Sequence, residues 1–505
     1  MEASLLRMLA APAGSAPAIS APGRPTLDFA GLRALASRTL SGLNALGIGR
    51  NDRVAIVLAN GPEMATCFVA AACGVATAPL NPAYRSEEFE FYLADLNARA
   101  LIVEHDSASP AIAVAQRLGV RILDLRAGAA AGEFTLTPRD GGGGTPAALG
   151  GAAEPGDVSM VLHTSGTTSR PKIVPLSQRN LCASAANIGR TLQFAPGDCG
   201  LNIMPLFHIH GLIAGVLAPL AAGSQVFCTP GFNALKFFGW MEEAKPTWYT
   251  AVPTMHQAIV GRASKNLDVI RRHPLRFIRS SSSSMPPQVI REIEAAFGAP
   301  LIESYGMTEA CHQMASNPLP PALRKPGSVG LAAGPEVAIM GEDGRLLAQG
   351  ETGEIVIRGA NVTAGYESNP KANAEAFVNG WFRTGDQGVI DADGYLSLTG
   401  RLKEIINRGG EKISPREIDE ILMDHAAVAQ VVCFGMPHPK LGEEVAAVVV
   451  LRDGGQSSER ELQDFVAQRA ADFKVPKKIL FMDEIPKGAT GKLQRIGLAA
   501  KLGLG

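Results

Sequence analysis

HTSGTTSRPK, residues 163–172, is the stretch of sequence around which the rest of the chain can be arranged. Its hydroxyl side chains, its glycine and its backbone N–H groups can converge on one anion, and Arg170 and Lys172 add positive charge. Apolar residues precede it at Val158 to Leu162 and follow it at Ile173 to Leu176. The pattern predicts a phosphate-binding loop between two strands.

Two other interpretations of this stretch have to be weighed. It is not a Walker loop, because no glycine stands directly before Lys172 and no Ser or Thr follows it. An ordinary Ser/Thr-rich surface turn has the same composition, and the stretch alone leaves that alternative open. The choice depends on the motifs further along the chain.

Length and composition bound the class of protein. At 505 residues the chain exceeds what one hydrophobic core usually organises, so two or more domains are expected. A formal net charge of −1 gives no field that would steer the chain to nucleic acid or to an anionic membrane. Seven scattered cysteines without a C-x-x-C pair indicate reduced thiols and a cytoplasmic protein. Neither a secretion signal nor a membrane span is expected, because Glu2 and Arg7 interrupt the N-terminus and the apolar runs are short.

The first part of the chain alternates between strand and helix patterns. Strands are expected at Val54 to Leu58, Val75 to Leu80 and Ala100 to Glu104, and helices at Met64 to Ala72 and Ser86 to Leu96. This alternation predicts an α/β array. The Gly-, Ala- and Pro-rich segment 127–154 is expected to be a loop that leads to the phosphate-binding stretch.

Two histidines, His208 and His210, lie in the apolar stretch MPLFHIHGL. Period-2 spacing places both on one face of a predicted strand, where satisfied core histidines are more common than ligands. A zinc site would need further ligands, and the sequence does not arrange them.

Five consecutive serines, Ser280 to Ser284, follow Arg279 and a predicted strand at Leu275 to Ile278. An amphipathic helix is expected after Met285-Pro286-Pro287, so the serines occupy a strand-to-helix turn. A solvated linker is the alternative for such a run. We favour a site lining, because ligands of open α/β sheets bind at the carboxyl ends of strands.

The stretch SYGMTEACH, residues 304–312, follows a further predicted strand. Tyr305 offers a flat face for a purine, Thr308 a hydroxyl for a phosphate, and Glu309 a carboxylate suited to magnesium. Short β-type runs with Asp-Gly turns between Leu331 and Leu398 predict a β-rich subdomain.

A compact α+β piece is expected from Arg401 onward. Ser414 with Glu417, and Ser458 with Glu461, each predict a capping box at the start of a helix. Near the end, PKGATGKLQR puts Lys492 in a glycine-bearing turn, where one more solvated lysine is the alternative to a functional one.

Five motifs occur in order from His163 to Lys492: HTSGTTSRPK, ESYGMTEA, WFRTGD, GRLKEIINRGGEKISP and PKGATGK. Together they resemble the adenylate-forming superfamily of acyl-CoA synthetases, peptide-synthetase adenylation domains and luciferases, over essentially the whole chain. The combination of TSGTTSRPK, MPLFHIHGL, LRFIRSSSSS and TEACHQMASNPLP is most similar to the oxalate–CoA ligase group. Two positions depart from the general superfamily loop, which has glycine where Ser169 and Ile173 stand here.

The resemblance implies an α/β fold in two domains. Residues 1–400 are implied to form a large N-terminal domain of α/β layers plus a β-rich subdomain, and residues 401–505 a small mobile α+β domain. The implied reaction joins a carboxylic acid to ATP, giving an acyl-AMP and pyrophosphate, after which the CoA thiolate displaces AMP. ATP, Mg²⁺ and CoA are therefore expected to bind.

Several positions match the family's functional residues. Lys492 is implied as the adenylation lysine, Thr308 as the α-phosphate contact and Glu309 as the magnesium ligand. Lys403 is the implied hinge, about which Gly409-Gly410 would move toward CoA. The other implied ATP-binding residues are Thr164, Ser165, Gly166, Thr167, Thr168, Lys172, Ser304, Tyr305, Gly306, Asp386 and Arg401.

The expected substrate is a short, doubly charged acid, because an apolar acyl chain would leave buried hydroxyls and imidazoles unpaired. Oxalate fits best, malonate or another small dicarboxylate comes second, and a medium-chain or aryl acid third. The residues expected to bind it are Ser281, Ser282, Ser283 and His312, with Arg279 ranked below the serines and His208 either on the acid or at the thiol channel. A carrier-protein-loading enzyme and a non-catalytic nucleotide sensor are the alternatives from other classes. A monomer or homodimer is expected.

Overall fold

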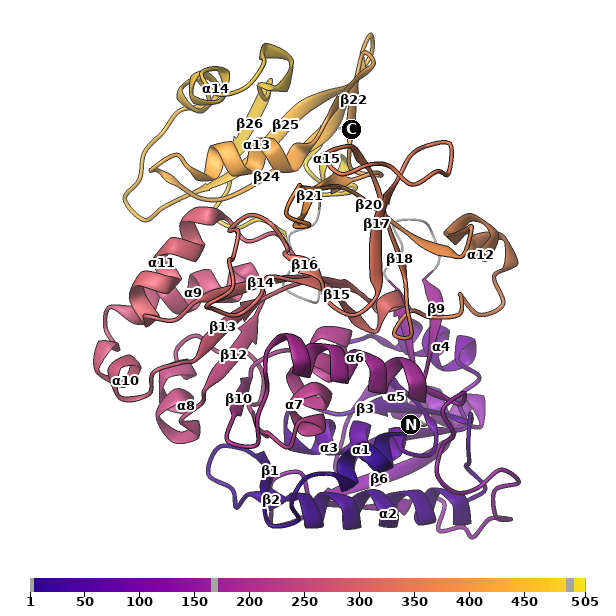
Figure 1. Cartoon of the computed structure of the whole chain (residues 1–505). Coiled ribbons are helices and arrows are strands. Elements are labelled where there is room, and N and C mark those ends of the chain that lie inside the picture. The colour runs from indigo at the N-terminus through magenta and orange to yellow at the C-terminus, as the bar shows by residue number, and fades with distance from the viewer. Residues whose placement is uncertain (1–3, 165–170, 487–494, 505) are drawn as a thin grey trace.

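A computed structural model describes residues 4–164, 171–486 and 495–504 of the chain (Figure 1). Four sheets of nine, seven, five and five strands carry the architecture, with helices packed between and around them. The mixed α/β class expected from the sequence is confirmed. The helices away from the site are α1 (Leu5–Ala10), α2 (Phe29–Ala45), α5 (Pro110–Leu118), α6 (Gln178–Thr191), α7 (Ala218–Ala221), α8 (Phe237–Ala244), α10 (Leu267–Arg272), α12 (Pro370–Ala376) and α15 (Leu498–Lys501).

The seven-stranded sheet contains the predicted alternation of strand and helix. Its order is β7 (Phe134–Pro138), β6 (Arg121–Ala127), β5 (Ala100–Glu104), β3 (Arg53–Val57), β4 (Ala76–Pro79), β8 (Val158–Thr164) and β9 (Lys172–Ser177). The parallel strands β3 and β4 are joined by α3 (Pro62–Ala72), and α4 (Ser86–Asp95) leads into β5. The predicted loop at 127–154 is wrong in part, because β7 pairs with β6 inside it.

The nine-stranded sheet supplies most of the site. Its order is β16 (Leu331–Ala332), β15 (His312–Ser316), β14 (Leu301–Met307), β13 (Phe277–Ser280), β12 (Trp248–Ala251), β10 (Cys199–Asn202), β11 (Gln225–Cys228), β1 (Pro17–Ser20) and β2 (Leu27–Asp28). Strands β10, β12, β13 and β14 are parallel, so their carboxyl ends meet at one edge. Ser280 ends β13, and the other four serines lie between it and α11 (Pro287–Phe297), which confirms the predicted strand-to-helix turn from Ser281 onward.

The histidines of MPLFHIHGL are not on a strand, and that prediction is wrong. A turn at His208 leads into a π-helix, η1 (His210–Leu217), whose residues are all buried. The wider π-helical turn displaces side chains relative to an α-helix, and such turns are frequent at functional sites. His208 and His210 consequently do not share one strand face.

The β-rich subdomain predicted for 331–398 is present. A five-stranded sheet contains β17 (Glu336–Met340), β18 (Thr352–Arg358), β20 (Trp381–Ile390), β19 (Phe377–Val378) and β21 (Leu396–Arg401), all antiparallel. The register of β20 against β21 places Asp386 directly opposite Arg401. Two motifs that are separate in the sequence therefore meet at this pair.

The last sheet lies above the rest of the chain in Figure 1. It contains β23 (Glu411–Ile413), β22 (Ile406–Arg408), β25 (Gly442–Leu451), β24 (Val428–His438) and β26 (Lys478–Phe481), and α13 (Pro415–Met423) and α14 (Glu459–Ala467) accompany it. Ser458 caps α14 by accepting a hydrogen bond from the Glu461 N–H, which is one half of the predicted capping box. The cap predicted at Ser414 is wrong, because its hydroxyl donates instead to the Thr399 carbonyl.

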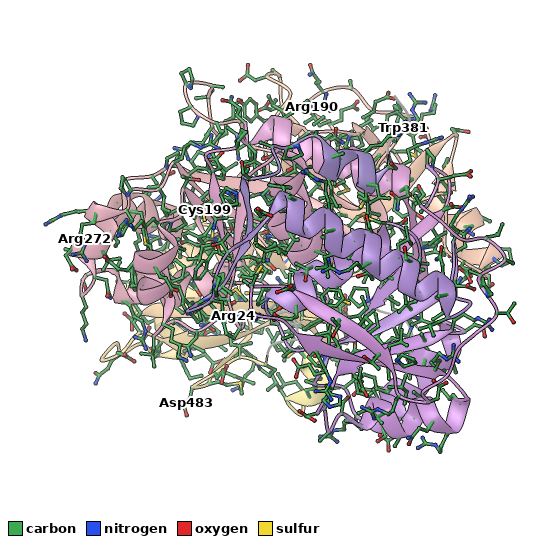
Figure 2. The ribbon with its side chains drawn as sticks, turned by 90° about the horizontal axis from the view of Figure 1, so that it is seen from below. Arg24, Arg190, Cys199, Arg272, Trp381 and Asp483 are labelled. Atoms are coloured by element: carbon green, nitrogen blue, oxygen red, sulfur yellow. The ribbon has the colours of Figure 1, made fainter. Side chains whose placement is uncertain are left out.

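The interior is apolar and contains all seven cysteines as buried free thiols. Burial raises the pKa of the Cys73 thiol to about 12, so it stays protonated near neutral pH. Cys199 lies inside the packed mass of side chains, whereas Arg272 projects from the outer edge (Figure 2). Within the described ranges, none of the helices combines the length and apolar character needed to cross a bilayer.

Candidate active site

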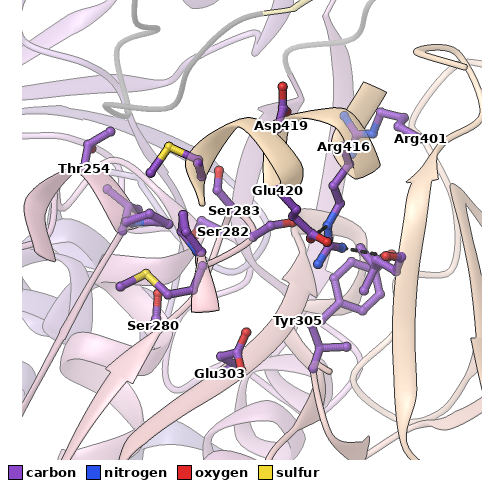
Figure 3. A pocket seen from close by; sticks show the side chains of 18 of the residues that line it. Thr254, Ser280, Ser282, Ser283, Glu303, Tyr305, Arg401, Arg416, Asp419 and Glu420 are labelled. Carbon is purple, nitrogen blue, oxygen red and sulfur yellow. Dashed lines mark hydrogen bonds and ion pairs between the residues drawn. The ribbon is translucent and has the colours of Figure 1, made fainter. Parts of the chain in front are cut away.

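A cavity of about 380 Å³ opens between the edge of the nine-stranded sheet and the C-terminal sheet. Ser282 and Tyr305 line it from below, and Arg416 and Glu420 of α13 reach it from above (Figure 3). The strands β20 and β21 contribute Asp386 and other residues to one wall. The cavity thus collects residues from three of the five motifs that the sequence singled out: ESYGMTEA, WFRTGD and GRLKEIINRGGEKISP.

Asp386 is the buried centre of one wall of the cavity. The Tyr305 hydroxyl donates to its Oδ2 at 2.5 Å, and the Arg401 Nε donates to its Oδ1 at 2.8 Å. The Asp386 carboxylate raises the pKa of Arg401, and burial raises that of Tyr305. The three predicted residues are brought together, with Asp386 held in place by the other two.

Glu309 and Lys172 are connected through Tyr366, a residue that sequence reasoning missed. Glu309 lies on the short helix η2 (Thr308–Ala310) and is buried, and the Tyr366 hydroxyl donates to its Oε1 at 2.8 Å. Burial raises the pKa of Glu309. The Lys172 ammonium lies 4.3 Å from the centre of the Tyr366 ring. The sequence around Tyr366 contains no motif that would have identified this residue.

A buried carboxylate beside a lysine and a half-buried hydroxyl at Thr308 suits a cation that also carries phosphate ligands. Magnesium is usually held by one or two carboxylates together with substrate phosphates, which Glu309 matches. Among residues 4–164, 171–486 and 495–504, no group of three or more His, Cys, Asp or Glu forms a metal cage. The donor set therefore fits Mg²⁺ bound with a nucleotide.

The strands on either side of the predicted phosphate loop are present. β8 and β9 pair antiparallel, with Thr164 opposite Lys172 at the base of the loop. Ile173 is a buried strand residue opposite His163, which explains why this position does not need glycine. Ser165, Gly166, Thr167 and Thr168 lie outside the described residues.

The serines of the β13–α11 turn point in different directions. The Ser281 hydroxyl donates to the Ser304 carbonyl at 3.1 Å, and the Ser304 hydroxyl donates to the Ser280 carbonyl at 3.2 Å. These bonds join β13 to β14. Ser282 Oγ lies 3.0 Å from Nδ1 of His210, and Ser283 is exposed. Of the three serines expected to bind the acid, only Ser282 contacts the His210 side chain, and binding of the acid stays a prediction.

Arg279 is the buried centre of a cluster behind the serine turn. Its side chain is 0% exposed, its Nη2 lies 3.0 Å from Nε2 of His312, and its Nη1 lies 3.3 Å from Nε2 of His210. The two imidazole rings are stacked with their centres 4.9 Å apart. Gln313 Oε1 lies 3.4 Å from the guanidinium. Burial lowers the pKa of Arg279 to about 9.

No carboxylate forms an ion pair with Arg279 within the described part of the chain. A buried cation without a counter-ion is costly, so the cluster is suited to receive an anion. Two of its members have left-handed backbones, with φ of 76° at Ser282 and 92° at His312. Non-glycine residues in that region are uncommon and gather at functional sites.

His210 contacts both Ser282 and Arg279, whereas the part that His208 plays stays a prediction. The His210 Nδ1 faces the Ser282 hydroxyl, and its Nε2 lies 2.7 Å from the Thr250 hydroxyl on β12. His208 is half-buried in the preceding turn, beside Phe207. The H-x-H spacing pointed to both rings, but only the π-helical start decides which one faces Arg279.

Lys403 is exposed in the turn after β21. Gly409 and Gly410 form the tight turn between β22 and β23, with φ of 61° and 102°, which favours glycine at both positions. Gly306 lines the cavity at a place where a Cβ would meet the His312 carbonyl at 1.7 Å. Lys492 lies outside the described residues.

Residues 8–367 match the AMP-binding enzyme family, and residues 417–492 match the AMP-binding enzyme C-terminal domain. The chain belongs to the AMP-binding enzymes. It is 44% identical to an oxalate–CoA ligase of Arabidopsis thaliana over 95% of this chain and 94% of that one. It is 41% identical to an oxalate–CoA ligase of Saccharomyces cerevisiae, over 88% and 86% of the two chains. Among solved structures, the chain is similar to ATP-bound MatB from Rhodopseudomonas palustris, with a TM-score of 0.89 and 29% identity over 99% of both chains.

Proposed function

We propose that this AMP-binding enzyme is an ATP-dependent oxalate–CoA ligase. The enzyme is an acid–CoA ligase of the adenylate-forming kind. Oxalate is our assignment of its substrate. In the proposed reaction an oxalate oxygen attacks the α-phosphate of ATP and pyrophosphate leaves, and then the CoA thiolate attacks the acyl carbon and AMP leaves.

The observation that carries the choice of acid is the buried, uncompensated Arg279. Oxalate is a dianion at neutral pH, so it brings a second carboxylate after the first has been used for adenylation. Ser282 lines the cavity and contacts His210, and Arg279 and His312 complete the buried cluster behind it, to which we assign the donors for such a group. Hydrogen bonds to charged groups are stronger than neutral ones, and oxalate has no apolar carbon that these polar groups would leave unpaired.

The nucleotide is assigned to the other walls. Asp386 and Arg401 are proposed to bind the ribose hydroxyls, and Ser304, Tyr305 and Gly306 to face the adenine. Thr164 to Thr168 with Lys172 are proposed for the outer phosphates, Thr308 for the α-phosphate and Glu309 for Mg²⁺. A fixed set of donors around transferring oxygens offsets the repulsion between two anionic reactants.

Lys492 is proposed as the lysine that bridges the attacking carboxylate and the α-phosphate. We further propose a domain boundary at residues 400/401 and rotation of 401–505 about Lys403, which would bring Gly409 and Gly410 toward CoA. One pocket cannot present Lys492 and admit the thiol together, so the two steps need two arrangements.

The test is pyrophosphate release with oxalate, malonate, acetate, octanoate and coumarate, each with and without CoA. We expect oxalate to give the highest kcat/KM, with oxalyl-CoA and AMP as products. A preference for malonate would move the assignment to the runner-up dicarboxylate. A preference for octanoate or coumarate would end the dianion hypothesis, and ADP as product would end the AMP-forming one. A nucleotide sensor would release no pyrophosphate, and a carrier-loading enzyme would not use CoA.

A further inference from the structure

Arg495 lies at the wall of the active-site cavity and joins three segments of the C-terminal part of the chain. Its Nη2 donates to Oδ2 of Asp419 on α13 at 2.8 Å, and its Nε donates to Oε2 of Glu404, just after β21, at 3.1 Å. Its Nη1 donates to the Cys433 carbonyl on β24. Every nitrogen of the guanidinium therefore has a partner, and the partners come from a helix, a strand and the turn after β21.

The cluster around Arg495 is balanced in charge and fixed in geometry. Asp419 also accepts a hydrogen bond from the Cys433 N–H at 2.6 Å, so both of its carboxylate oxygens are used. Burial lowers the pKa of Arg495, but Asp419 and Glu404 more than offset this, and the net pKa is raised. A guanidinium whose charge is already matched by two carboxylates is suited to hold the protein together and is poorly suited to hold a phosphate.

Two residues of this cluster lie close in the sequence to Lys492 and to Lys403. Arg495 comes three residues after Lys492, and Glu404 directly follows Lys403. Three residues span at most about 11 Å of extended chain, so an anchor at Arg495 limits where Lys492 can lie. The anchor is built on Glu404, Asp419 and Cys433, all of which follow Lys403 in the chain.

We propose that Arg495 is a positioning residue that ties the segment carrying Lys492 to the C-terminal sheet through Asp419 and Glu404. The inference rests on the proposed function, in which Lys492 serves adenylation. The tie lies wholly on the C-terminal side of Lys403, so it is kept when the C-terminal part rotates. Its effect is on adenylation alone, because the thioester-forming step does not use Lys492.

The test compares the two half-reactions in Arg495→Gln. We expect adenylation, measured as pyrophosphate release without CoA, to slow on the order of 100-fold, the effect of displacing a reacting group by about 1 Å. The KM for ATP and the rate of CoA with chemically supplied acyl-AMP should stay near those of the unaltered enzyme. An equal loss of both half-reactions, or a rise in the KM for ATP alone, would overturn the inference.

Two further variants separate positioning from general damage. Asp419→Asn keeps the acceptor for the Cys433 N–H but removes the charge, so it should slow adenylation selectively and less than Arg495→Gln. Arg495→Lys keeps the charge but cannot reach three acceptors with one ammonium, so it should recover only part of the rate. Arg460→Gln is the matched control, because Arg460 is 83% exposed and pairs only with Asp464 within its own helix among the described ion pairs. It should leave both half-reactions unchanged.

The experiment also distinguishes failure of the inference from failure of the proposed function. If the unaltered enzyme releases no pyrophosphate with any acid of the panel, or if Lys492→Ala keeps its adenylation rate, the proposed function fails and the inference fails with it. If Lys492→Ala loses adenylation while Arg495→Gln and Asp419→Asn keep it, only the inference is overturned.

Discussion

Arg279 is a buried residue that we expect to be unfavourable for stability and, on the proposed function, useful for binding. Its guanidinium is enclosed by two imidazoles and an amide, and the described ion pairs give it no carboxylate. Replacing a buried charge that lacks a counter-ion by an apolar side chain of similar size often leaves a protein as stable or more stable. We therefore expect the stability and the activity of an Arg279 variant to change in opposite directions.

Arg279→Met removes the charge and keeps a long side chain. The melting temperature should be maintained or rise, while kcat/KM for oxalate should fall by about 10- to 150-fold, the value of a charge-assisted hydrogen bond. The KM for ATP should change little. Calorimetry and steady-state kinetics provide both readouts.

Arg276→Met is the control for that variant. Arg276 lies three residues earlier and pairs with Asp198 away from the cavity. Its loss should leave kcat/KM for oxalate unchanged. If Arg279→Met behaves in the same way, Arg279 does not bind the acid.

Single residues were the hardest feature to predict. The sequence identified the serine run, Arg279 and His312, but rotamers and φ angles decide where each side chain points. Ser281 bonds a neighbouring strand, whereas the left-handed φ of 76° at Ser282 turns that serine toward His210. The sequence likewise does not show that Arg279 is buried among imidazoles and an amide and has no carboxylate among its described ion pairs.

At the level of elements, the connection from β21 to β22 is the one whose conformation matters most for the proposed rotation. The Leu402 N–H donates to the Gly385 carbonyl at 3.0 Å, and the Glu404 N–H donates to the Arg401 carbonyl at 2.8 Å. Lys403 stands between these two bonds. Hydrogen bonds thus fix the backbone before and after Lys403, but none of the described backbone bonds involves the Lys403 N–H.

Lys403→Pro should separate the two half-reactions. Proline fixes φ near −65° and restricts the preceding residue, so it should oppose a change of dihedral at this turn. We expect thioester formation from supplied acyl-AMP to slow at least about tenfold, because this step needs the rotation that proline opposes. Adenylation should stay within about threefold of the rate of the unaltered enzyme. Lys403→Ala, which removes the side chain without fixing φ, should retain both rates. Survival of both rates in the proline variant would place the hinge elsewhere.

Regular elements followed from the sequence where periodicity was strong. The β3–α3–β4 unit, the strands on either side of the phosphate loop and the serine turn were all anticipated. The exceptions have local physical causes. The Ser414 hydroxyl has a carbonyl partner on β21, which competes with capping, and the π-helix at His210 depends on packing that a period-2 pattern does not contain.

For the molecule as a whole, Glu303 links its stability to pH. It lies on β14 at the cavity, accepts a hydrogen bond from the Gly327 N–H at 3.0 Å, and is faced by Arg416 and Glu420 of α13 and by Arg324. Burial raises its pKa from 4.5 to about 8. The stabilising contribution of the protonated acid is therefore complete below pH 4.5 and is lost as the pH rises through 8.

Glu303→Gln should remove that dependence. The variant should melt at a higher temperature than the unaltered protein at pH 8, and the difference should shrink toward pH 5. The slope that it removes is at most about 1.4 kcal/mol per pH unit in this window. Glu336→Gln, which alters an exposed carboxylate paired with Arg358, should show no such gain. A constant difference across the window would contradict the assignment.

The uncompensated guanidinium of Arg279 has a consequence for the resting enzyme as well. On the proposed function, a cluster that binds one small anion also binds others, and salt screens a buried charge less than an exposed one. We therefore expect sulfate, phosphate or bicarbonate to compete with the acid by mass action. The acid concentration at half-saturation should then be higher in a salt-rich solution than in dilute buffer.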